Sequence, residues 1–281
     1  MLLAALSFAV MGTLVKLGSA KFSTAELVFY RSFFGLLVIF LVARYQKLSL
    51  KTPVLPQQMV RATLGFLSLL MFFYAISHLD LATAMTLNYT SPLFMASFLS
   101  LSLPERPRKM LIFAIILGFI GVALLLKPSF QADELVAGGW GLLSGATAGY
   151  VYVQVIQLSR IGEPDWRTVF YFTLICTLGG GAWMLSAGFH TITLKDAVVL
   201  LGLGIAGTIG QLSMTRAYRT GNPLVVGSLA YVTVILASIF GVLIGDPAIS
   251  LDRWLAILVI IIAGVISVFA GNKSRHKHAA K

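Results

Sequence analysis

The sequence predicts an all-α integral membrane protein with ten transmembrane helices arranged as two inverted five-helix repeats. Three observations lead to this fold class: an apolar composition, ten apolar stretches of membrane-spanning length, and a weak correspondence between the two halves of the chain. Of the 281 residues, 58% are hydrophobic and only 11% carry a charge. A soluble domain has about 45–50% apolar and about 25% charged residues. The composition therefore excludes a disordered chain, a collagen-like fibre, a disulfide-stapled secreted domain and an ordinary cytosolic enzyme.

Apolar stretches follow one another along the whole chain. A helix that crosses about 30 Å of hydrocarbon needs about 20 mainly apolar residues, and it satisfies its own backbone hydrogen bonds without water. The ten stretches cover residues 2–18, 25–43, 62–77, 81–103, 110–126, 135–158, 168–189, 197–217, 223–245 and 254–271. The connections between them are short, which leaves no room for a separate soluble domain.

The positions of the basic residues predict the orientation of the chain, whose formal net charge is +11. Short cytoplasmic loops retain an excess of Lys and Arg. With a cytoplasmic N-terminus, 15 basic residues fall on the inner side, namely Arg44, Lys47, Lys51, Arg61, Arg106, Arg108, Lys109, Arg160, Arg167, Arg216, Arg219, Lys273, Arg275, Lys277 and Lys281. Only 4 fall on the outer side, namely Lys21, Lys127, Lys195 and Arg253. We therefore expect both termini in the cytoplasm and a basic face at the membrane surface, with no binding of nucleic acid.

The two halves of the chain correspond at a few positions. Residues 28–30 and 169–171 both read Val-Phe-Tyr early in a stretch. At nearly the same offset, four further residues are shared, namely Ala75 with Ala217, Leu87 with Leu229, Tyr89 with Tyr231, and Phe98 with Phe240. A repeat of five helices crosses the membrane an odd number of times, so its second copy is inverted, an arrangement that suits alternating access. We expect a first repeat at 1–128, a second at 135–271, and a basic cytoplasmic tail at 272–281.

These residues resemble the ten-helix EamA-like carriers of the drug/metabolite transporter superfamily, over essentially the whole chain. The resemblance rests on residues 87–93 (Leu-Asn-Tyr-Thr-Ser-Pro-Leu), Glu105, 118–122 (Gly-Phe-Ile-Gly-Val), Lys16 and Arg31, with weaker counterparts in Tyr231, Asp246 and 263–265. The second half departs from the pattern where Val234 stands in place of Pro92. The resemblance implies movement of small metabolites, often amino acids or their derivatives, across a bacterial inner membrane.

Polar side chains at helical spacing indicate where a cavity runs. In the sixth stretch, Thr147, Tyr150 and Gln154 share one face, and the glycines at 141, 145 and 149 share the opposite face, which suits close packing on a neighbouring helix. The expected cavity residues are Asn88, Tyr89, Thr147, Tyr150, Gln154, Gln211, Ser228 and Tyr231. Hydroxyls and amides inside a membrane also join helices to one another, and this structural role stays open for each of them.

Two basic residues fall within apolar stretches. Arg31 lies about seven residues inside the second stretch, where a charge needs a partner, water or a path to the interface. It either bonds backbone carbonyls or attracts a carboxylate of the substrate. Lys16 lies near the outer end of the first stretch and reaches the interface more easily, so we place it second.

The sequence predicts a transporter that moves a small metabolite, an amino acid or an amino-acid or nucleoside derivative, by alternating access, with export as the expected direction. A channel-like facilitator is the alternative, followed by an intramembrane enzyme. No nucleophile with a base, carboxylate pair or metal-ligand cluster lies at reaction depth, so we expect no catalytic residue, metal or cofactor. Residues 202–207 spell Gly-Leu-Gly-Ile-Ala-Gly inside a span, which predicts a packing surface rather than a nucleotide site. The expected partners are the substrate and the lipid bilayer, with the protein a monomer or homodimer.

Overall fold

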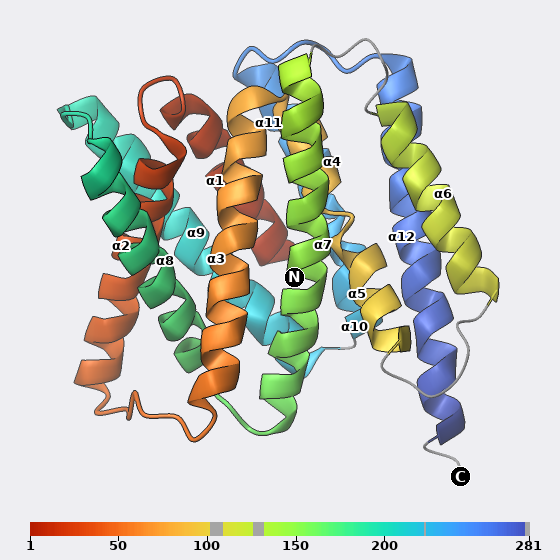
Figure 1. Cartoon of the computed structure of the whole chain (residues 1–281), viewed down its shortest axis with the longest axis horizontal. Helices are drawn as coiled ribbons and strands as arrows, with labels where there is room; N and C mark the ends of the chain where they lie inside the picture. The colour runs from red at the N-terminus through yellow and green to blue at the C-terminus, as the bar shows by residue number, and fades with distance from the viewer. Residues whose placement is uncertain (102–108, 126–131, 222, 279–281) are drawn as a thin grey trace.

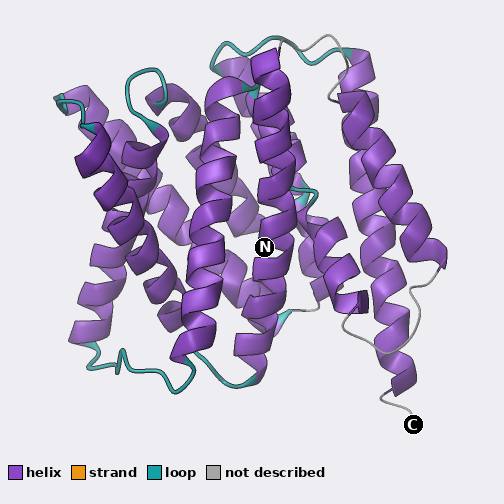
Figure 2. Ribbon diagram, in the orientation of Figure 1, coloured by secondary structure: helices purple, strands orange, loops and turns teal. Residues whose placement is uncertain are grey.

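The computed structural model describes residues 1–101, 109–125, 132–221 and 223–278, and every regular element in these ranges is a helix (Figure 2). The helices are α1 (Leu2–Gly18), α2 (Thr24–Tyr45), α3 (Leu55–His78), α4 (Leu81–Asn88), α5 (Ser91–Leu101), α6 (Lys109–Leu125), α7 (Ala132–Arg160), α8 (Asp165–Ala187), α9 (Leu194–Thr220), α10 (Pro223–Ala230), α11 (Val232–Leu243) and α12 (Leu251–His278). This confirms the predicted all-α class. Glu105, Arg106, Arg108, Lys127 and Lys281 lie outside the described residues.

Several helices have the length and composition of membrane spans. Within the described residues, five segments are long and apolar enough to cross a bilayer: α2, α3, α8, α9 and residues 225–243 of α10 and α11. Shorter apolar helices are Leu2–Gly18 and Ile112–Val122. Large apolar side chains also face outward along these helices and along α12, among them Leu41, Ile116, Ile205 and Leu258, each at least 51% exposed. Such continuous apolar exposure suits contact with lipid, and the chain is a multi-pass membrane protein.

Two of the predicted stretches differ from expectation because each is divided into two helices. The stretch at 81–103 forms α4 and α5, and the stretch at 223–245 forms α10 and α11. In the first, α4 ends at Asn88, four residues before Pro92. The proline ring cannot donate a backbone hydrogen bond and clashes with the carbonyl four residues back. Beside the break, the carbonyl of Leu87 accepts a hydrogen bond from Oγ1 of Thr90 at 2.7 Å.

The second break occurs without a proline. Tyr231 separates α10 from α11, and its amide donates to the carbonyl of Ser228 at 3.3 Å, a tighter turn than an α-helix has. Tyr89 and Tyr231, which the sequence paired across the two halves, therefore both stand at a helix break.

The helices stand side by side with their ends on two opposite sides of the molecule (Figure 1). The upper side carries the connections α1–α2, α8–α9 and α11–α12, and the lower side carries α2–α3 and α7–α8. Helix α3 packs along α7, α1 along α9, α2 along α8, and α6 along α12. Each of these pairs joins the first half of the chain to the second, so the buried core lies between the halves.

The glycine face of α7 packs on the break between α4 and α5, as the sequence predicted of a close neighbour. A Cβ added to Gly145 would lie 2.6 Å from the carbonyl oxygen of Leu87, and one added to Gly149 would lie 2.8 Å from that of Ser91. Backbone atoms cannot give way as a side-chain end can. Glycine at these positions therefore holds α7 against the broken helix.

Candidate functional site: a central cavity with two buried arginines

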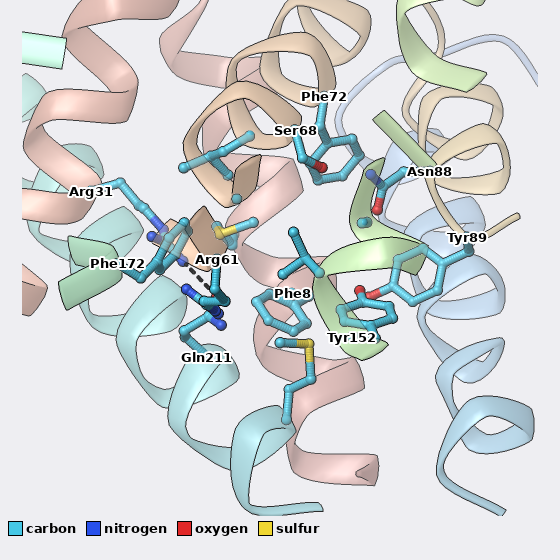
Figure 3. A pocket seen from close by; sticks show the side chains of 16 residues that line it. Phe8, Arg31, Arg61, Ser68, Phe72, Asn88, Tyr89, Tyr152, Phe172 and Gln211 are labelled. Atoms are coloured by element: carbon cyan, nitrogen blue, oxygen red, sulfur yellow. Dashed lines mark hydrogen bonds between the residues drawn. The ribbon is translucent and has the colours of Figure 1, made fainter. Parts of the chain in front are cut away.

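A cavity of about 80 Å³ lies between the two halves of the chain, with room for several water molecules. Helices α1, α2, α3, α4, α7, α8 and α9 contribute to its wall, together with Tyr89 after α4. The lining residues are Phe8, Met11, Arg31, Arg61, Gly65, Ser68, Leu69, Phe72, Asn88, Tyr89, Ala148, Val151, Tyr152, Phe172, Gln211 and Met214 (Figure 3). Among the described residues, the lining contains two cationic side chains and no carboxylate.

Arg31 reaches the cavity from the middle of α2 and is only 2% exposed. Its Nη2 donates a hydrogen bond to Oε1 of Gln211 in α9 at 3.3 Å (Figure 3). Its Cζ lies 5.1 Å from the ring centroid of Phe172, a cation–π contact. The Nε and Nη1 atoms of Arg31 are buried without a hydrogen-bond partner. Within the described part of the chain, two nitrogens of this guanidinium, which carry three N–H groups between them, are therefore unsatisfied.

Arg61 also lies against the Phe172 ring. Its Cζ is 4.4 Å from the centroid of Phe172, and the side chain is 1% exposed. Its Nε and Nη1 atoms also lack a partner. Because both arginines contact the Phe172 ring, their Cζ atoms are at most 9.5 Å apart, the sum of the two distances. Two unit charges at that separation repel each other by about 2 kcal/mol at an effective dielectric constant of about 20.

The placement of Arg61 corrects the sequence prediction, which put it in an inner loop. Helix α3 begins at Leu55, seven residues before the predicted start, so Arg61 lies in its second turn. The signal in the sequence was Pro56, which occupies the first turn of α3. Proline is favoured there because the amide it lacks would have no partner within the helix.

Glycines make room for the two cationic side chains. A Cβ added to Gly207 of α9 would lie 2.8 Å from Nε of Arg31, and one added to Gly65 of α3 would lie 2.9 Å from the ring of Phe172. Gly204 similarly accommodates the ring of Phe34. The glycine-rich segment of α9 is thus a packing surface, as predicted, and one of the groups that packs on it is the Arg31 side chain.

The opposite end of the cavity carries neutral polar groups. Asn88 donates through Nδ2 to Oγ of Ser144 at 2.9 Å, and Oγ of Ser68 donates to the carbonyl of Ser144 at 2.9 Å. These bonds tie α4 and α3 to α7. Tyr89 and Tyr152 lie beside this cluster, across the cavity from the arginines (Figure 3). The cavity therefore has a cationic end and an amide, hydroxyl and aromatic end.

The structure brings four of the expected residues together around this cavity: Asn88, Tyr89, Gln211 and Arg31. The remaining five do not line it. They are Thr147, Tyr150, Gln154, Ser228 and Tyr231.

Three of those five lie on α7 and are placed by its glycine face. The glycines pack on α4 and α5, and the three polar residues lie outside the cavity lining. The hydroxyl of Thr147 donates to the carbonyl of Leu143 within its own helix, and Tyr150 is 38% exposed with its ring against Phe98. The flank of the same helix lines the cavity instead, through Ala148, Val151 and Tyr152.

Ser228 and Tyr231 lie around the second helix break, outside the cavity lining. Tyr231 is 3% exposed, and its hydroxyl has no hydrogen-bond partner. This hydroxyl fills the space beside Gly264 of α12, where an added Cβ would overlap it. Ser228 is half-buried and its hydroxyl is also without a partner.

Lys16 contributes to a set of ion pairs on the upper side rather than to the central cavity. Its Nζ donates to the carbonyl of Leu79 at 2.6 Å and lies 3.8 Å from Oδ1 of Asp246. Asp246 in turn accepts from the amide of Leu81 at 2.8 Å. Two further ion pairs on this side also join the two halves, namely Lys21 with Asp196 and Asp80 with Arg253, and Nδ1 of His190 lies 3.0 Å from Oε2 of Glu26.

A buried carboxylate joins the halves on the lower side. Glu163, which is 6% exposed, follows α7 and accepts hydrogen bonds from Thr52 at 2.8 Å and from Gln58 at 3.1 Å. Arg167 forms an ion pair with it at 3.2 Å and also donates to the carbonyl of Ser49. This network fixes the connection between α2 and α3 against the start of α8.

The geometry is that of a binding site. Donors and aromatic rings from both halves converge on a space that holds no nucleophile paired with a base, and within the described residues no group of three His, Cys, Asp or Glu side chains could hold a metal ion. What the lining offers is recognition: two guanidiniums for an anionic group and amide, hydroxyl and aromatic side chains for the rest of a small molecule.

Comparisons with known proteins agree with this architecture. Residues 1–127 match the EamA-like transporter family. The chain is 33% identical over 239 residues to the pseudopaline exporter CntI of Pseudomonas aeruginosa, covering 85% of this chain and 84% of that protein. It is 29% identical over 274 residues to an uncharacterized transporter of Helicobacter pylori, covering 94% and 92%.

A solved crystal structure shares the fold, with a TM-score of 0.67 at 16% identity over 96% of this chain and 98% of the other. Fold, cavity and sequence similarity lead to one conclusion. The chain is a membrane transporter and belongs to the EamA-like transporter family of the drug/metabolite transporter superfamily.

Proposed function

We propose that this transporter exports a small metabolite with an anionic group, an amino acid or an amino-acid or nucleoside derivative, across the bacterial inner membrane by alternating access. The observation that carries the proposal is the contact between Arg31 and Gln211 inside the central cavity. One residue belongs to the first half of the chain and the other to the second, so a molecule bound between them contacts both halves. Asn88 and Tyr89 would bind the part of the molecule away from the arginines.

Alternating access between two inverted halves of five spans each fits the way the helices pair. In a repeat that relates α1 to α7, α2 to α8 and α3 to α9, the contact of α3 with α7 corresponds to that of α9 with α1. Helix α2 packs on its own counterpart α8, and α6 on α12. The breaks at Tyr89 and Tyr231 stand at corresponding positions. These relationships support the inverted repeat, in which α4 with α5 and α10 with α11 each count as one broken span.

Polar links between the halves occur on both sides of the cavity. The pairs of Lys16 with Asp246 and Asp80 with Arg253 lie on the upper side, and the Glu163 network lies on the lower side. In an alternating-access cycle, one set must separate while the other holds. These two ion pairs on the upper side are partly exposed. Such pairs contribute only about 0–1 kcal/mol each, so rocking of the halves can break and re-form them.

The basic residues support a cytoplasmic lower side. Arg44, Arg160 and Arg216 lie near the ends of α2, α7 and α9 on that side, where α12 also ends (Figure 1). This distribution agrees with both termini in the cytoplasm. Export is the direction that the relative's name, pseudopaline exporter, supports.

Counterflow in proteoliposomes tests the proposal. Vesicles containing the purified protein are loaded with single unlabelled amino acids, dipeptides, nucleosides or organic acids, and entry of the same labelled compound is followed. A carrier gives saturable uptake that is accelerated by the compound on the far side, whereas protein-free vesicles do not. Unitary currents without counterflow would support a channel-like facilitator, and release of a chemically altered compound would support an intramembrane enzyme; either result rejects the carrier.

A further inference from the structure

We propose that Arg31 and Arg61 together form a two-guanidinium anion site, and that the preferred occupant of the cavity carries two negative charges at that end, as two carboxylates or one phosphate. This inference rests on the proposed function, since it defines the class of molecule that the transporter carries. It differs from the sequence expectation, in which Arg31 alone was a carboxylate partner and Arg61 was a loop residue.

Arg31 and Arg61 are buried without a compensating carboxylate among the described residues. Arg31 is 2% and Arg61 is 1% exposed, and neither forms an ion pair within the described part of the chain. Four of their nitrogens, Nε and Nη1 of each, are buried and lack a hydrogen-bond partner. A buried polar atom in a folded protein normally has a partner, and a buried charge needs one even more strongly. Both side chains line the same cavity, so their unpartnered nitrogens indicate a site for an anionic ligand.

The groups that already contact the two arginine side chains are neutral. Gln211 satisfies one donor of Arg31, and the face of Phe172 attracts both cations. Neither neutral contact cancels a full charge. Gly207 and Gly65 provide the space in which the side chains and the Phe172 ring lie within the bundle. The fold therefore accommodates both guanidiniums inside the apolar interior while leaving their charges unneutralised.

The short distance between the two guanidiniums determines the charge that the occupant needs. The two Cζ atoms are at most 9.5 Å apart, so one small molecule can reach both. A single carboxylate neutralises one cation and leaves the other buried without an anion. Two carboxylates, or a phosphate, neutralise both, so that the loaded cavity carries no net charge while it is closed to water. Guanidiniums suit these groups because their planar donors match carboxylate and phosphate oxygens.

Ligand-dependent thermal unfolding of the purified full chain tests the charge requirement without requiring transport. The probes are succinate and glutarate, which carry two carboxylates, their monoamides succinamate and glutaramate, which carry one, and inorganic phosphate, all balanced to one ionic strength with sodium chloride. We expect at least one dianion to raise the melting temperature of the wild-type protein, with an affinity about 10- to 100-fold above that of its monoanionic counterpart. The phosphate arm separates phosphate from dicarboxylate recognition.

Two variants assign the effect to the arginines. Arg61→Gln and Arg31→Gln are each expected to abolish the preference for the dianion, and Arg216→Gln, an exposed arginine on α9, is expected to preserve it. Without ligand, Arg61→Gln should melt no lower than the wild type, because removing an uncompensated buried charge removes its desolvation cost. An arginine with a purely structural role would give the opposite result, a lower melting temperature in the absence of ligand.

The outcomes separate this inference from the proposed function. Dianion binding that depends on Arg61, in a protein that shows no counterflow with any compound, supports the anion site and rejects the carrier. Counterflow of a compound without two negative charges, at the same affinity in the wild type and in Arg61→Gln, supports the carrier and overturns the anion site. The anion site is also overturned if each dicarboxylate stabilises the protein no more than its own monoamide does and phosphate has no effect.

Discussion

Arg31 and Gln211 are 180 residues apart in sequence and meet in the centre of the molecule, where Nη2 of the arginine donates to Oε1 of the glutamine at 3.3 Å. Gln211 is 5% exposed, and one turn further along α9 its neighbour Thr215 returns a hydrogen bond to the Gln211 carbonyl. The Gln211 side chain lines the cavity and accepts a hydrogen bond from one edge of the guanidinium. This contact links the two halves at the depth where a substrate would bind.

Replacing Gln211 with Ala should lower transport more than it lowers protein yield. The change removes an acceptor from Arg31, and a buried charged donor that loses its partner costs about 1–3 kcal/mol. We expect the apparent affinity for the transported compound to fall about 10-fold or more in counterflow. Gln154→Ala is the matched control, because Gln154 is also a glutamine in a long helix but does not line the cavity. Equal losses of transport in the two variants would contradict the placement of the site.

Gly145→Ala should destabilise the protein. The added Cβ would lie 2.6 Å from the carbonyl oxygen of Leu87 and 2.9 Å from that of Asn88, so α7 must move away from the broken helix. We expect a loss of about 1–3 kcal/mol, seen as a lower melting temperature. Gly139→Ala in the same helix is the control, since its added Cβ meets no atom within 4 Å and should be neutral or slightly stabilising. Similar melting temperatures for the two variants would disprove the close contact.

Gly207→Ala should displace the Arg31 side chain without removing any polar group. The new methyl group would lie 2.8 Å from Nε and 3.0 Å from Cγ of Arg31. We expect weaker substrate binding, with a loss of affinity between those of wild type and Arg31→Gln. Gly202→Ala, where the added Cβ contacts only the end of the Leu14 side chain at 3.1 Å, should retain the affinity of the wild type. Unchanged binding in Gly207→Ala would mean that the position of Arg31 is not important for the ligand.

Glu163→Gln should weaken the lower side of the molecule. The carboxylate accepts from Thr52, Gln58 and Arg167, and the amide keeps its size but loses the charge and one acceptor. Charged hydrogen bonds of this kind contribute about 1.5–3 kcal/mol each, so the melting temperature should fall by several degrees. Arg160→Gln, an exposed change close by, should have little effect. Preserved stability in Glu163→Gln would show that the network does not hold the connection between α2 and α3.

Cysteine labelling should place the two sides of the molecule. In a Cys176→Ser background, which removes the single native cysteine, Phe189→Cys lies on the upper side after α8 and Leu48→Cys lies on the lower side after α2. Intact cells treated with a membrane-impermeant maleimide should label the cysteine at 189, and the one at 48 only after permeabilisation. The reverse pattern would invert the proposed orientation.

The sequence predicted only part of the site, because it shows which residues are polar but not where their side chains lie in the folded protein. Asn88, Tyr89 and Gln211 were expected from polar residues within apolar stretches, and they do line the cavity. Thr147 and Tyr150 had the same signal, yet Thr147 bonds to its own helix and Tyr150 packs on Phe98 of α5, both outside the cavity lining. Polar periodicity identifies a face of a helix, but only the neighbouring helices decide what that face meets.

The sequence by itself determined the chemistry that a bilayer imposes: all-helical structure, membrane-spanning apolar stretches and a glycine face on α7. Each depends on local properties of the chain, namely hydrophobicity or side-chain size. Only the tertiary structure brought Arg31, Arg61 and Phe172 together from three different helices. In charge and in its neighbours along the sequence, Arg61 resembles the basic residues expected in a cytoplasmic loop. Its burial follows from the length of α3 and from the helices packed around it, which is a property of the assembled bundle.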